Sequence, residues 1–171
     1  AIGDTGQKYT ADSIIISTGA QARCLNLKSE QEIRGFVVSA CATFDGYFFK
    51  EKNIVVVGGG DSAMEEASFL TKFAKKVTII HRREVFKASK IMLDRAKNNH
   101  LIDIIVNKSI ESINGSQKDG VSSIELKDTI SGEKSTFECE GVFYGIGHNP
   151  NTDLFNGVIN VDDNGYIITK P

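Results

Sequence analysis

The chain of 171 residues has little proline, few cysteines and no concentration of charge of one sign. Its two prolines argue against a proline-rich linker, whereas 16 glycines are typical of tight turns between strands and helices. Three cysteines at wide spacing predict neither a disulfide framework nor a metal site, and they favour a reducing, cytoplasmic location. No apolar run approaches the ~18 residues that a membrane helix needs.

Acidic and basic residues nearly balance, which gives a formal net charge of −2. We therefore expect neither nucleic acid nor a membrane as a partner, because both call for a clustered basic face. The 40% hydrophobic and 25% charged residues are typical of a globular protein of one domain, with or without flanks. The chain begins with Ala1 and no secretory leader, so we expect it to be cut or processed from something longer.

The middle of the chain alternates buried strands with a helix. Continuous apolar runs at 53–57 and 76–80 predict two strands of a parallel sheet that is covered on both faces. Between them, apolar side chains recur at helical spacing. These side chains are Met64, Ala67, Phe69, Leu70 and Phe73. Residues 53–80 therefore predict one β-α-β unit and an α/β fold class.

Further elements are expected on either side of this unit. We expect a helix at 88–97 and strands at 9–17, 102–106 and 141–145. An antiparallel meander is expected between Ile110 and Phe137, and the stretch 21–35 is expected to be a connector. The turn signals are Asn114-Gly115, Lys118-Asp119-Gly120, Ser131-Gly132 and Asn164-Gly165.

A glycine motif joins the first of these buried strands to the helix. In Gly58-x-Gly60-x-x-Ala63, the first glycine allows a tight turn and the second lets the backbone approach a pyrophosphate. Ala63 is small enough for the helix to pack close to the strand. We expect Asp61 to be the helix N-cap and Ser62 to assist, with free N–H groups binding phosphate oxygens. The pattern favours a dinucleotide site over a plain glycine turn.

The end of the second buried strand is basic where an NAD site usually has a carboxylate. His81, Arg82 and Arg83 follow the strand, and Lys87 lies a turn later. Cations at this place attract a ribose 2′-phosphate, so the sequence favours NADPH over NADH, with a solvated basic turn as the alternative. Glu84 lies beyond the arginines, and we expect it to start a helix or to pair with an Arg.

Four segments carry a family resemblance, and these are residues 39–46, 55–67, 81–84 and 145–152. Together they resemble the low-molecular-weight thioredoxin reductases, in register over essentially the whole chain. The resemblance implies a Rossmann-like, three-layer NADPH-binding domain at 37–145, with an antiparallel meander. It also implies strips of a domain that binds FAD at 1–36 and 146–171, with crossings at Thr18-Gly19 and at 145–147.

The resemblance also implies a reaction and roles for particular residues. Members of this family pass hydride from NADPH to FAD, and then electrons through a dithiol to the disulfide of thioredoxin. Arg82, Arg83 and Lys87 would hold the 2′-phosphate, and His81 would line the adenosine end. The implied cofactor site also includes Gly147, and either Glu65 or Glu66 near the nicotinamide amide.

Two departures from the family pattern matter. The redox motif Cys-x-x-Cys is here Cys41-Ala42-Thr43-Phe44, so the cysteine that meets the flavin is replaced by Phe44. Cys41 and the acid/base residue Asp45 are retained, but one thiol cannot store two electrons as an intramolecular disulfide. The FAD fingerprint is also absent, so we expect the chain alone to be inactive. Cys41 is interpreted either as a functional thiol at a helix start or as a small, half-buried hydrophobe.

Our main hypothesis is the NADPH-binding domain of a thioredoxin-reductase-like flavoenzyme, with FAD and a homodimer in the longer parent protein. Phe44 is then an introduced block of the dithiol or a natural loss. One alternative is a non-catalytic, NADP(H)-binding or redox-sensing module. Another is a flavin reductase that passes electrons to ferredoxin, which the retained Cys41 and Asp45 disfavour.

Overall fold

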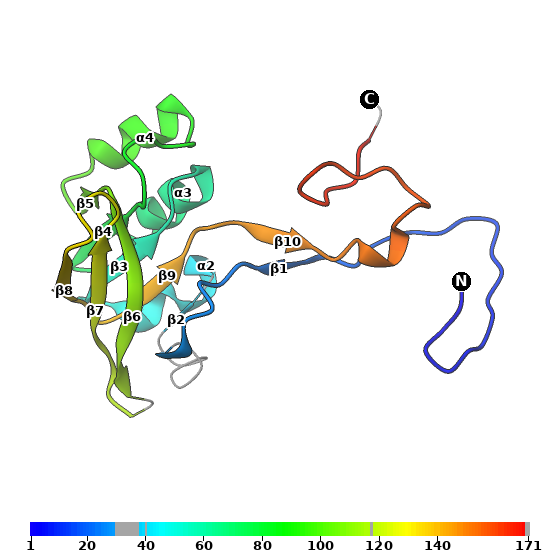
Figure 1. Cartoon of the computed structure of the whole chain (residues 1–171), viewed down its shortest axis with the longest axis horizontal. Coiled ribbons are helices and arrows are strands. Elements are labelled where there is room, and N and C mark those ends of the chain that lie inside the picture. Colours follow the sequence, from blue (N-terminus) through cyan, green and yellow to red (C-terminus); the bar gives the residue numbers. More distant parts are fainter. Residues whose placement is uncertain (30–37, 40, 117, 170–171) are drawn as a thin grey trace. The chain divides into compact units, whose positions relative to one another are not determined.

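The computed structural model describes residues 1–29, 38–39, 41–116 and 118–169 (Figure 1). The chain divides into two compact units, one formed by residues 1–21 and 149–171 and the other by residues 22–148. Across the described ranges, none of the helices has the length and apolar content that crossing a membrane requires.

The larger unit contains a five-stranded parallel sheet. Its order is β2 (Val38–Ser39), β9 (Val142–Tyr144), β3 (Asn53–Val57), β4 (Lys76–Ile80) and β5 (Ile102–Ile105). The strands predicted at 53–57, 76–80, 102–106 and 141–145 are therefore confirmed, the last two slightly shorter. Residues 54–57, 77–80 and 142–144 are buried because both faces of the sheet are covered, whereas the edge strand β5 is only partly buried.

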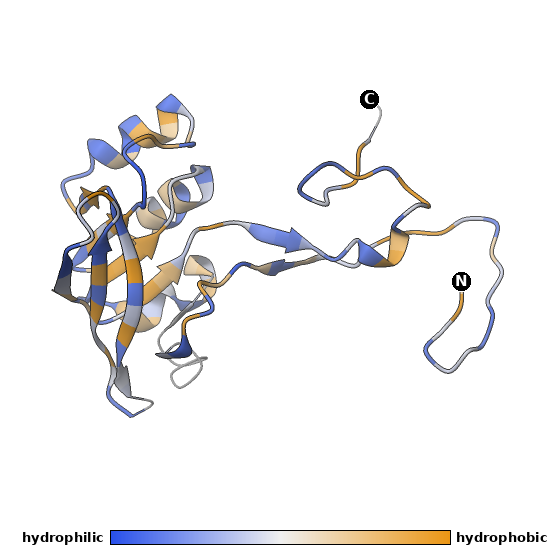
Figure 2. Cartoon of the chain, in the orientation of Figure 1, coloured by the Kyte–Doolittle hydropathy of each residue, from blue (hydrophilic) through white to orange (hydrophobic). Residues whose placement is uncertain are grey.

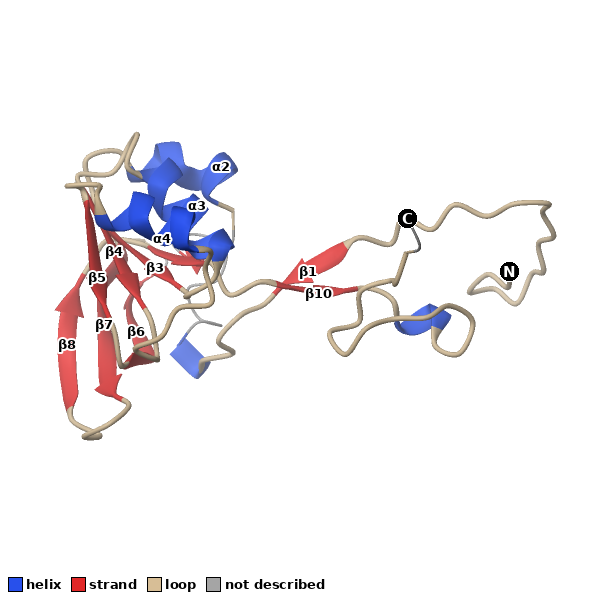
Figure 3. Ribbon diagram, turned by 90° about the horizontal axis from the view of Figure 1, so that it is seen from above, coloured by secondary structure: helices blue, strands red, loops and turns tan. Residues whose placement is uncertain are grey.

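Helices cover one face of this sheet (Figure 3). They are α2 (Ala42–Asp45), α3 (Asp61–Leu70) and α4 (Lys90–Lys97), with a 3-10 helix at Gly46–Phe49. Helix α3 buries Ala63, Met64, Ala67 and Leu70. The helix predicted at 88–97 begins only at Lys90, because the backbone of its N-cap Ser89 is non-helical, with a ψ of 148°.

An antiparallel meander lies on the other face and consists of β6 (Lys108–Ser116), β7 (Gly120–Asp128) and β8 (Lys134–Glu138). Hydrophilic and hydrophobic residues alternate along β6 and β7, as expected for strands with one buried face (Figure 2). The predicted meander is confirmed, but the turn predicted at Asn114-Gly115 is wrong. These residues lie within β6, at an irregularity in its register with β7.

The smaller unit has little regular structure. It contains a 3-10 helix at Asp153–Phe155 and a turn at Asn164-Gly165, as predicted, with Gly165 at φ +85°. The strand predicted at 9–17 is wrong. A strand needs a hydrogen-bonded neighbour, and no strand of the described residues lies beside these positions. Ile15, at the centre of this stretch, is 93% exposed.

The two crossings between the units pair with each other as short strands. These strands are β1 (Ala20–Ala22) and β10 (His148–Pro150). The predicted crossings at Thr18-Gly19 and 145–147 lie immediately before them. The boundaries between the two units lie immediately after Gln21 and immediately after His148.

Substitution of Gly145 tests the packing at the sheet edge. A Cβ on Gly145 would lie 2.6 Å from Cα of Ala63, whereas a Cβ on Gly60 would meet nothing within 4 Å. We expect Gly145→Ala to lower the free energy of unfolding by about 1–3 kcal/mol through overpacking. Gly60→Ala, the matched control, should cost less than about 1 kcal/mol in the same urea titration. Equal losses in the two variants would contradict this account of the packing.

Candidate functional site

The carboxyl ends of three parallel strands lie in register. Val57 of β3 pairs with Ile80 of β4 and with Tyr144 of β9, so the residues that follow each strand meet at one edge. The N–H of Gly58 donates to the carbonyl of Ile80 at 3.1 Å, and the N–H of Gly145 donates to that of Val57 at 2.9 Å. This edge is where open α/β sheets bind their ligands.

Gly58 begins the turn from β3 into α3. Its φ of +152° is unfavourable for other residues. A side chain here would also collide with the carbonyl oxygen of Gly145, and its Cβ would lie 2.8 Å from Cβ of Ala63. Ala63 is fully buried at this contact. The close helix–strand packing expected from the glycine motif is therefore present.

The first turn of α3 is open to a ligand. Gly60 is the N-cap, and its carbonyl accepts from the N–H groups of Ala63 at 3.1 Å and Met64 at 3.3 Å. The N–H groups of Asp61 and Ser62 precede these bonds and are available to an anion. No atom lies within 4 Å of the position that a Cβ on Gly60 would occupy, so the backbone is accessible there.

Asp61 has a different role from the predicted one. It is the first residue of α3 rather than the N-cap. Its Oδ1 accepts from the N–H of Ser89 at 2.7 Å, which ties the start of α3 to the loop after β4. The prediction of an Asp61 cap is wrong because a tertiary contact takes its carboxylate.

The loop of residues 81–89 is fixed against the glycine turn. The carbonyl of Gly59 accepts from the N–H groups of Lys87 at 2.8 Å and Ala88 at 3.0 Å. The ring of His81 lies against Gly59, leaving no room for a side chain there, and its Nε2 is 3.1 Å from the carbonyl oxygen of Val85. His81 thus helps to shape this corner, and its contact with adenosine stays a prediction.

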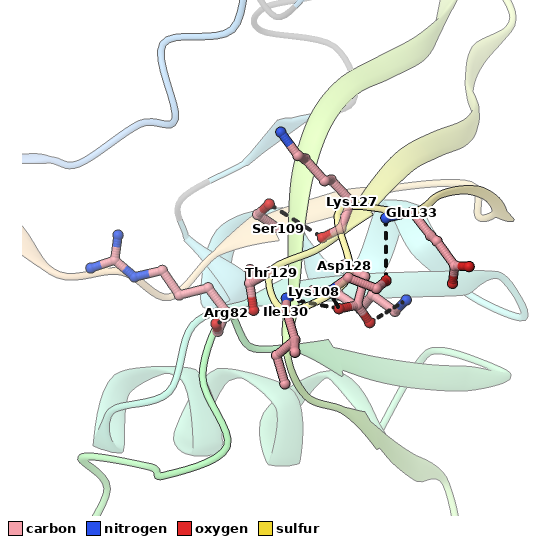
Figure 4. Close-up of polar contacts among 9 residues, drawn as sticks. Arg82, Lys108, Ser109, Lys127, Asp128, Thr129, Ile130 and Glu133 are labelled. Atoms are coloured by element: carbon pink, nitrogen blue, oxygen red, sulfur yellow. Dashed lines mark hydrogen bonds and ion pairs between the residues drawn. The ribbon is translucent and has the colours of Figure 1, made fainter.

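Three cations extend from this loop. Arg82, Arg83 and Lys87 are exposed, and no ion pair within the described ranges involves any of them. The backbone carbonyl of Arg82 accepts a hydrogen bond from the hydroxyl of Thr129, and its side chain points away from that contact (Figure 4). Glu84 starts no helix and forms no ion pair with the described residues, so both roles expected for it are wrong. The loop offers uncompensated positive charge.

Glu66 lies one turn into α3 with its carboxylate half-buried. Its Oε2 is buried without a hydrogen-bond partner among the described residues. Burial, and then the neighbouring Glu65, raise the pKa of Glu66 to about 7. Near neutral pH this carboxyl is therefore partly protonated and able to donate a hydrogen bond. Its orientation toward a nicotinamide amide stays a prediction.

Gly147 lies on the segment that leaves β9. It has a φ of +91°, and its carbonyl accepts from the N–H of Arg23 at 2.9 Å. The backbone here is thus fixed in a conformation that favours glycine. Nothing in this geometry requires a ligand, so its place in the cofactor site stays a prediction.

The segment around Cys41 forms a small polar cluster. Cys41 is the N-cap of α2, as expected for a cysteine at a helix start. Its N–H donates to Oγ of Ser39 at 2.9 Å, and that hydroxyl donates to Oδ2 of Asp45 at 2.5 Å. Ser39 thus connects the thiol-bearing residue to the carboxylate. It was missed from the sequence because this contact exists only in the folded chain.

Phe44 turns its ring to solvent and is 81% exposed. Tyr47 and Phe48, on the following 3-10 helix, are also exposed. Cys41 and Cys139 are free. Cys139 is buried, which raises the pKa of its thiol to about 12, so it is unreactive as expected for a structural residue.

No group of three or more His, Cys, Asp or Glu side chains within the described ranges is arranged to hold a metal ion.

The sequence analysis also did not identify Thr129, whose hydroxyl donates to the backbone carbonyl of Arg82 at 3.1 Å. In the sequence, Thr129 is marked only by the turn pattern from Asp128 to Gly132, and this pattern does not show which residues the turn contacts.

The fold and the site define an α/β domain of the dinucleotide-binding class. The family model described as pyridine nucleotide-disulphide oxidoreductase matches residues 2–171, and the chain belongs to this family.

Known thioredoxin reductases are similar over nearly the whole chain. That of Rickettsia typhi is 53% identical over 167 residues, covering 97% of this chain and 54% of the relative. The solved thioredoxin reductase structure from Giardia duodenalis has a TM-score of 0.88 at 40% identity. The match covers 99% of this chain and 55% of the Giardia chain. The structure from Streptococcus pyogenes has a TM-score of 0.80 at 40% identity. This match covers 89% of this chain and 49% of the Streptococcus chain. The chain spans about half the length of the curated relatives it matches.

The protonation of Glu66 predicts a pH-dependent stability. Its folded-state pKa of about 7 lies above the ordinary value of 4.5, so between these pH values the folded chain holds a proton that the unfolded chain releases. The free energy of unfolding therefore falls as the pH rises through this window. Glu66→Gln should flatten that fall and be more stable than the wild type above pH 7.

Urea titrations from pH 4.5 to 8.5 measure this difference. The control is Glu138→Gln, an exposed carboxylate on β8, which should keep the wild-type profile. If Glu66→Gln and the wild type lose stability in parallel, the burial of this carboxyl does not control the profile.

Proposed function

We propose that this chain is the NADPH-binding part of a longer enzyme that reduces the disulfide of thioredoxin. One observation carries the proposal. The strand register brings the open start of α3 and the unpaired cations of the 81–89 loop to one edge of the sheet. An anion-binding helix start beside free guanidinium groups suits a coenzyme with both a pyrophosphate and a 2′-phosphate.

Each part of the coenzyme has residues suited to it. The pyrophosphate lies at the accessible backbone of Gly60 and at the first N–H groups of α3. Arg82, Arg83 and Lys87 bind the 2′-phosphate with charge-assisted hydrogen bonds. Glu66, partly protonated near neutral pH, is the residue of α3 suited to bind the nicotinamide amide, which both donates and accepts hydrogen bonds.

The smaller unit is consistent with being part of a second domain, the rest of which belongs to a longer polypeptide. Its exposed apolar side chains include Ile14, Ile15, Leu154 and Val158, which a folded domain would normally bury. We assign residues 1–36 and 146–171 to this domain, which binds FAD in the longer enzyme. The flavin would take hydride from NADPH and pass electrons onward. A homodimer and a cytoplasmic location belong to the same proposal.

Phe44 limits what the chain does with those electrons. With Cys41 as the only thiol of the motif, no disulfide forms between positions 41 and 44. The exposed ring of Phe44 and the free thiol of Cys41 favour a second candidate function, which is a non-catalytic, NADP(H)-binding or redox-sensing module. In either case this chain alone has no reductase activity.

Charge reversal tests the coenzyme preference. Arg82→Glu and Arg83→Glu should each weaken NADPH binding about 10- to 100-fold, because each removes charged hydrogen bonds to the 2′-phosphate. NADH, which lacks this phosphate, should bind nearly as before in a fluorescence titration. Arg95→Glu, an exposed position on α4, is the matched control and should change neither affinity. Wild-type protein that binds both coenzymes equally would contradict the proposal.

Restoring the second thiol tests the reductase chemistry. In the full-length protein, Phe44→Cys should create NADPH-dependent reduction of thioredoxin or of an aromatic disulfide reagent, measured from NADPH oxidation. The same protein with Cys41→Ser added should return to the background rate. A flavin-loaded Phe44→Cys protein without activity would instead support the non-catalytic module.

A further inference from the structure

The meander touches the cation-bearing loop through its backbone. Oγ of Thr129, in the turn between β7 and β8, donates to the carbonyl of Arg82 at 3.1 Å across 47 residues of sequence. Next to it, the N–H of Lys108 donates to the carbonyl of His81 at 3.1 Å. Figure 4 shows these elements meeting, with the guanidinium of Arg82 directed outward. Two consecutive peptide groups of the loop are thus held by the meander.

The turn that carries Thr129 is itself fixed. Oδ1 of Asp128 accepts from the N–H groups of Ile130 and Ser131, both at 2.8 Å, and Oδ2 lies 2.9 Å from Nζ of Lys108. The N–H of Thr129 donates to the carbonyl of Asn107 at 2.9 Å. The N–H of Ser131 and the ammonium of Lys108 hold the pKa of Asp128 well below its usual range. Asp128 therefore stays charged at neutral pH, as its hydrogen bonds to the N–H groups of Ile130 and Ser131 favour.

The other end of the loop is held by the glycine turn. The carbonyl of Gly59 binds the N–H groups of Lys87 and Ala88, and Asp61 binds that of Ser89. The cations between these attachments are exposed and unpaired in the described structure. A loop held at both ends loses less conformational freedom when it binds a ligand, and this raises affinity.

We infer that Thr129 is a positioning residue that sets the preference for an adenosine 2′-phosphate. Its hydrogen bond fixes the peptide group between Arg82 and Arg83, and so the directions in which both side chains leave the main chain. The hydroxyl does not touch the ligand itself. This inference rests on the proposed function, because it assumes that the two arginines bind the 2′-phosphate.

A purely structural role makes a different prediction. If Thr129 only stabilised the fold, its loss would lower stability and weaken all adenine nucleotides alike. If it positions the arginines, its loss would weaken only ligands that carry the 2′-phosphate. The two roles separate when the same variants are measured with and without that phosphate.

The test compares adenosine 2′,5′-bisphosphate with adenosine 5′-monophosphate by calorimetric titration. Thr129→Val removes the donor at nearly constant volume, and it should weaken the bisphosphate about 3- to 10-fold and leave the monophosphate unchanged. Thr129→Ser keeps the hydroxyl and should bind as the wild type. The matched control is Thr136→Val on β8, whose hydroxyl bonds Glu125 within the meander, and it should change neither ligand.

The possible results separate the two hypotheses. Wild-type protein without preference for the bisphosphate contradicts the proposed function itself. A selective wild type with unchanged selectivity in Thr129→Val, or with no recovery in Thr129→Ser, overturns this inference alone. Urea titrations show whether each variant is folded, and Thr129→Ala is a second variant at this exposed position. Loss of folding in both Thr129→Val and Thr129→Ala would assign the hydroxyl to stability and overturn the inference.

Discussion

The contact among Gly58, Ala63 and Gly145 is the constraint on which the site depends. It leaves no space for a Cβ at either glycine, and it presses the first turn of α3 against the ends of β3 and β9. The helix N-terminus is thereby fixed at the carboxyl edge of the sheet. The turn also places the carbonyl of Gly59 where it holds the 81–89 loop, so one close packing arrangement positions both parts of the proposed coenzyme site.

Much of this arrangement could be predicted from local patterns. The continuous apolar runs of β3 and β4 are typical of strands covered on both faces, and the glycine motif after β3 indicates the turn and the close packing. The cations at 82, 83 and 87 are recognisable because they follow the second buried strand, where an NAD site usually has a carboxylate. Each of these signals depends on residues that are close in sequence.

The remainder depends on contacts between distant segments. The isoleucines at 14–16 have the composition of a strand, but no described strand lies beside them. Asp61 has the composition of an N-cap, but its carboxylate is taken by the N–H of Ser89. Ser39 and Thr129 carry no motif, and their partners are known only once the chain has folded. Local patterns describe what a residue is able to do, and the fold decides which option is used.

The cations of the 81–89 loop are solvent-exposed and contribute nothing to the buried core of the sheet. If these cations bind the coenzyme as proposed, coenzyme choice and thermodynamic stability depend on separate groups of residues in this protein. Exchange of the charges on these exposed side chains would leave the packing of the sheet unchanged. Under the proposed function, a change of nicotinamide coenzyme would thus need no compensating substitutions in the interior of the fold.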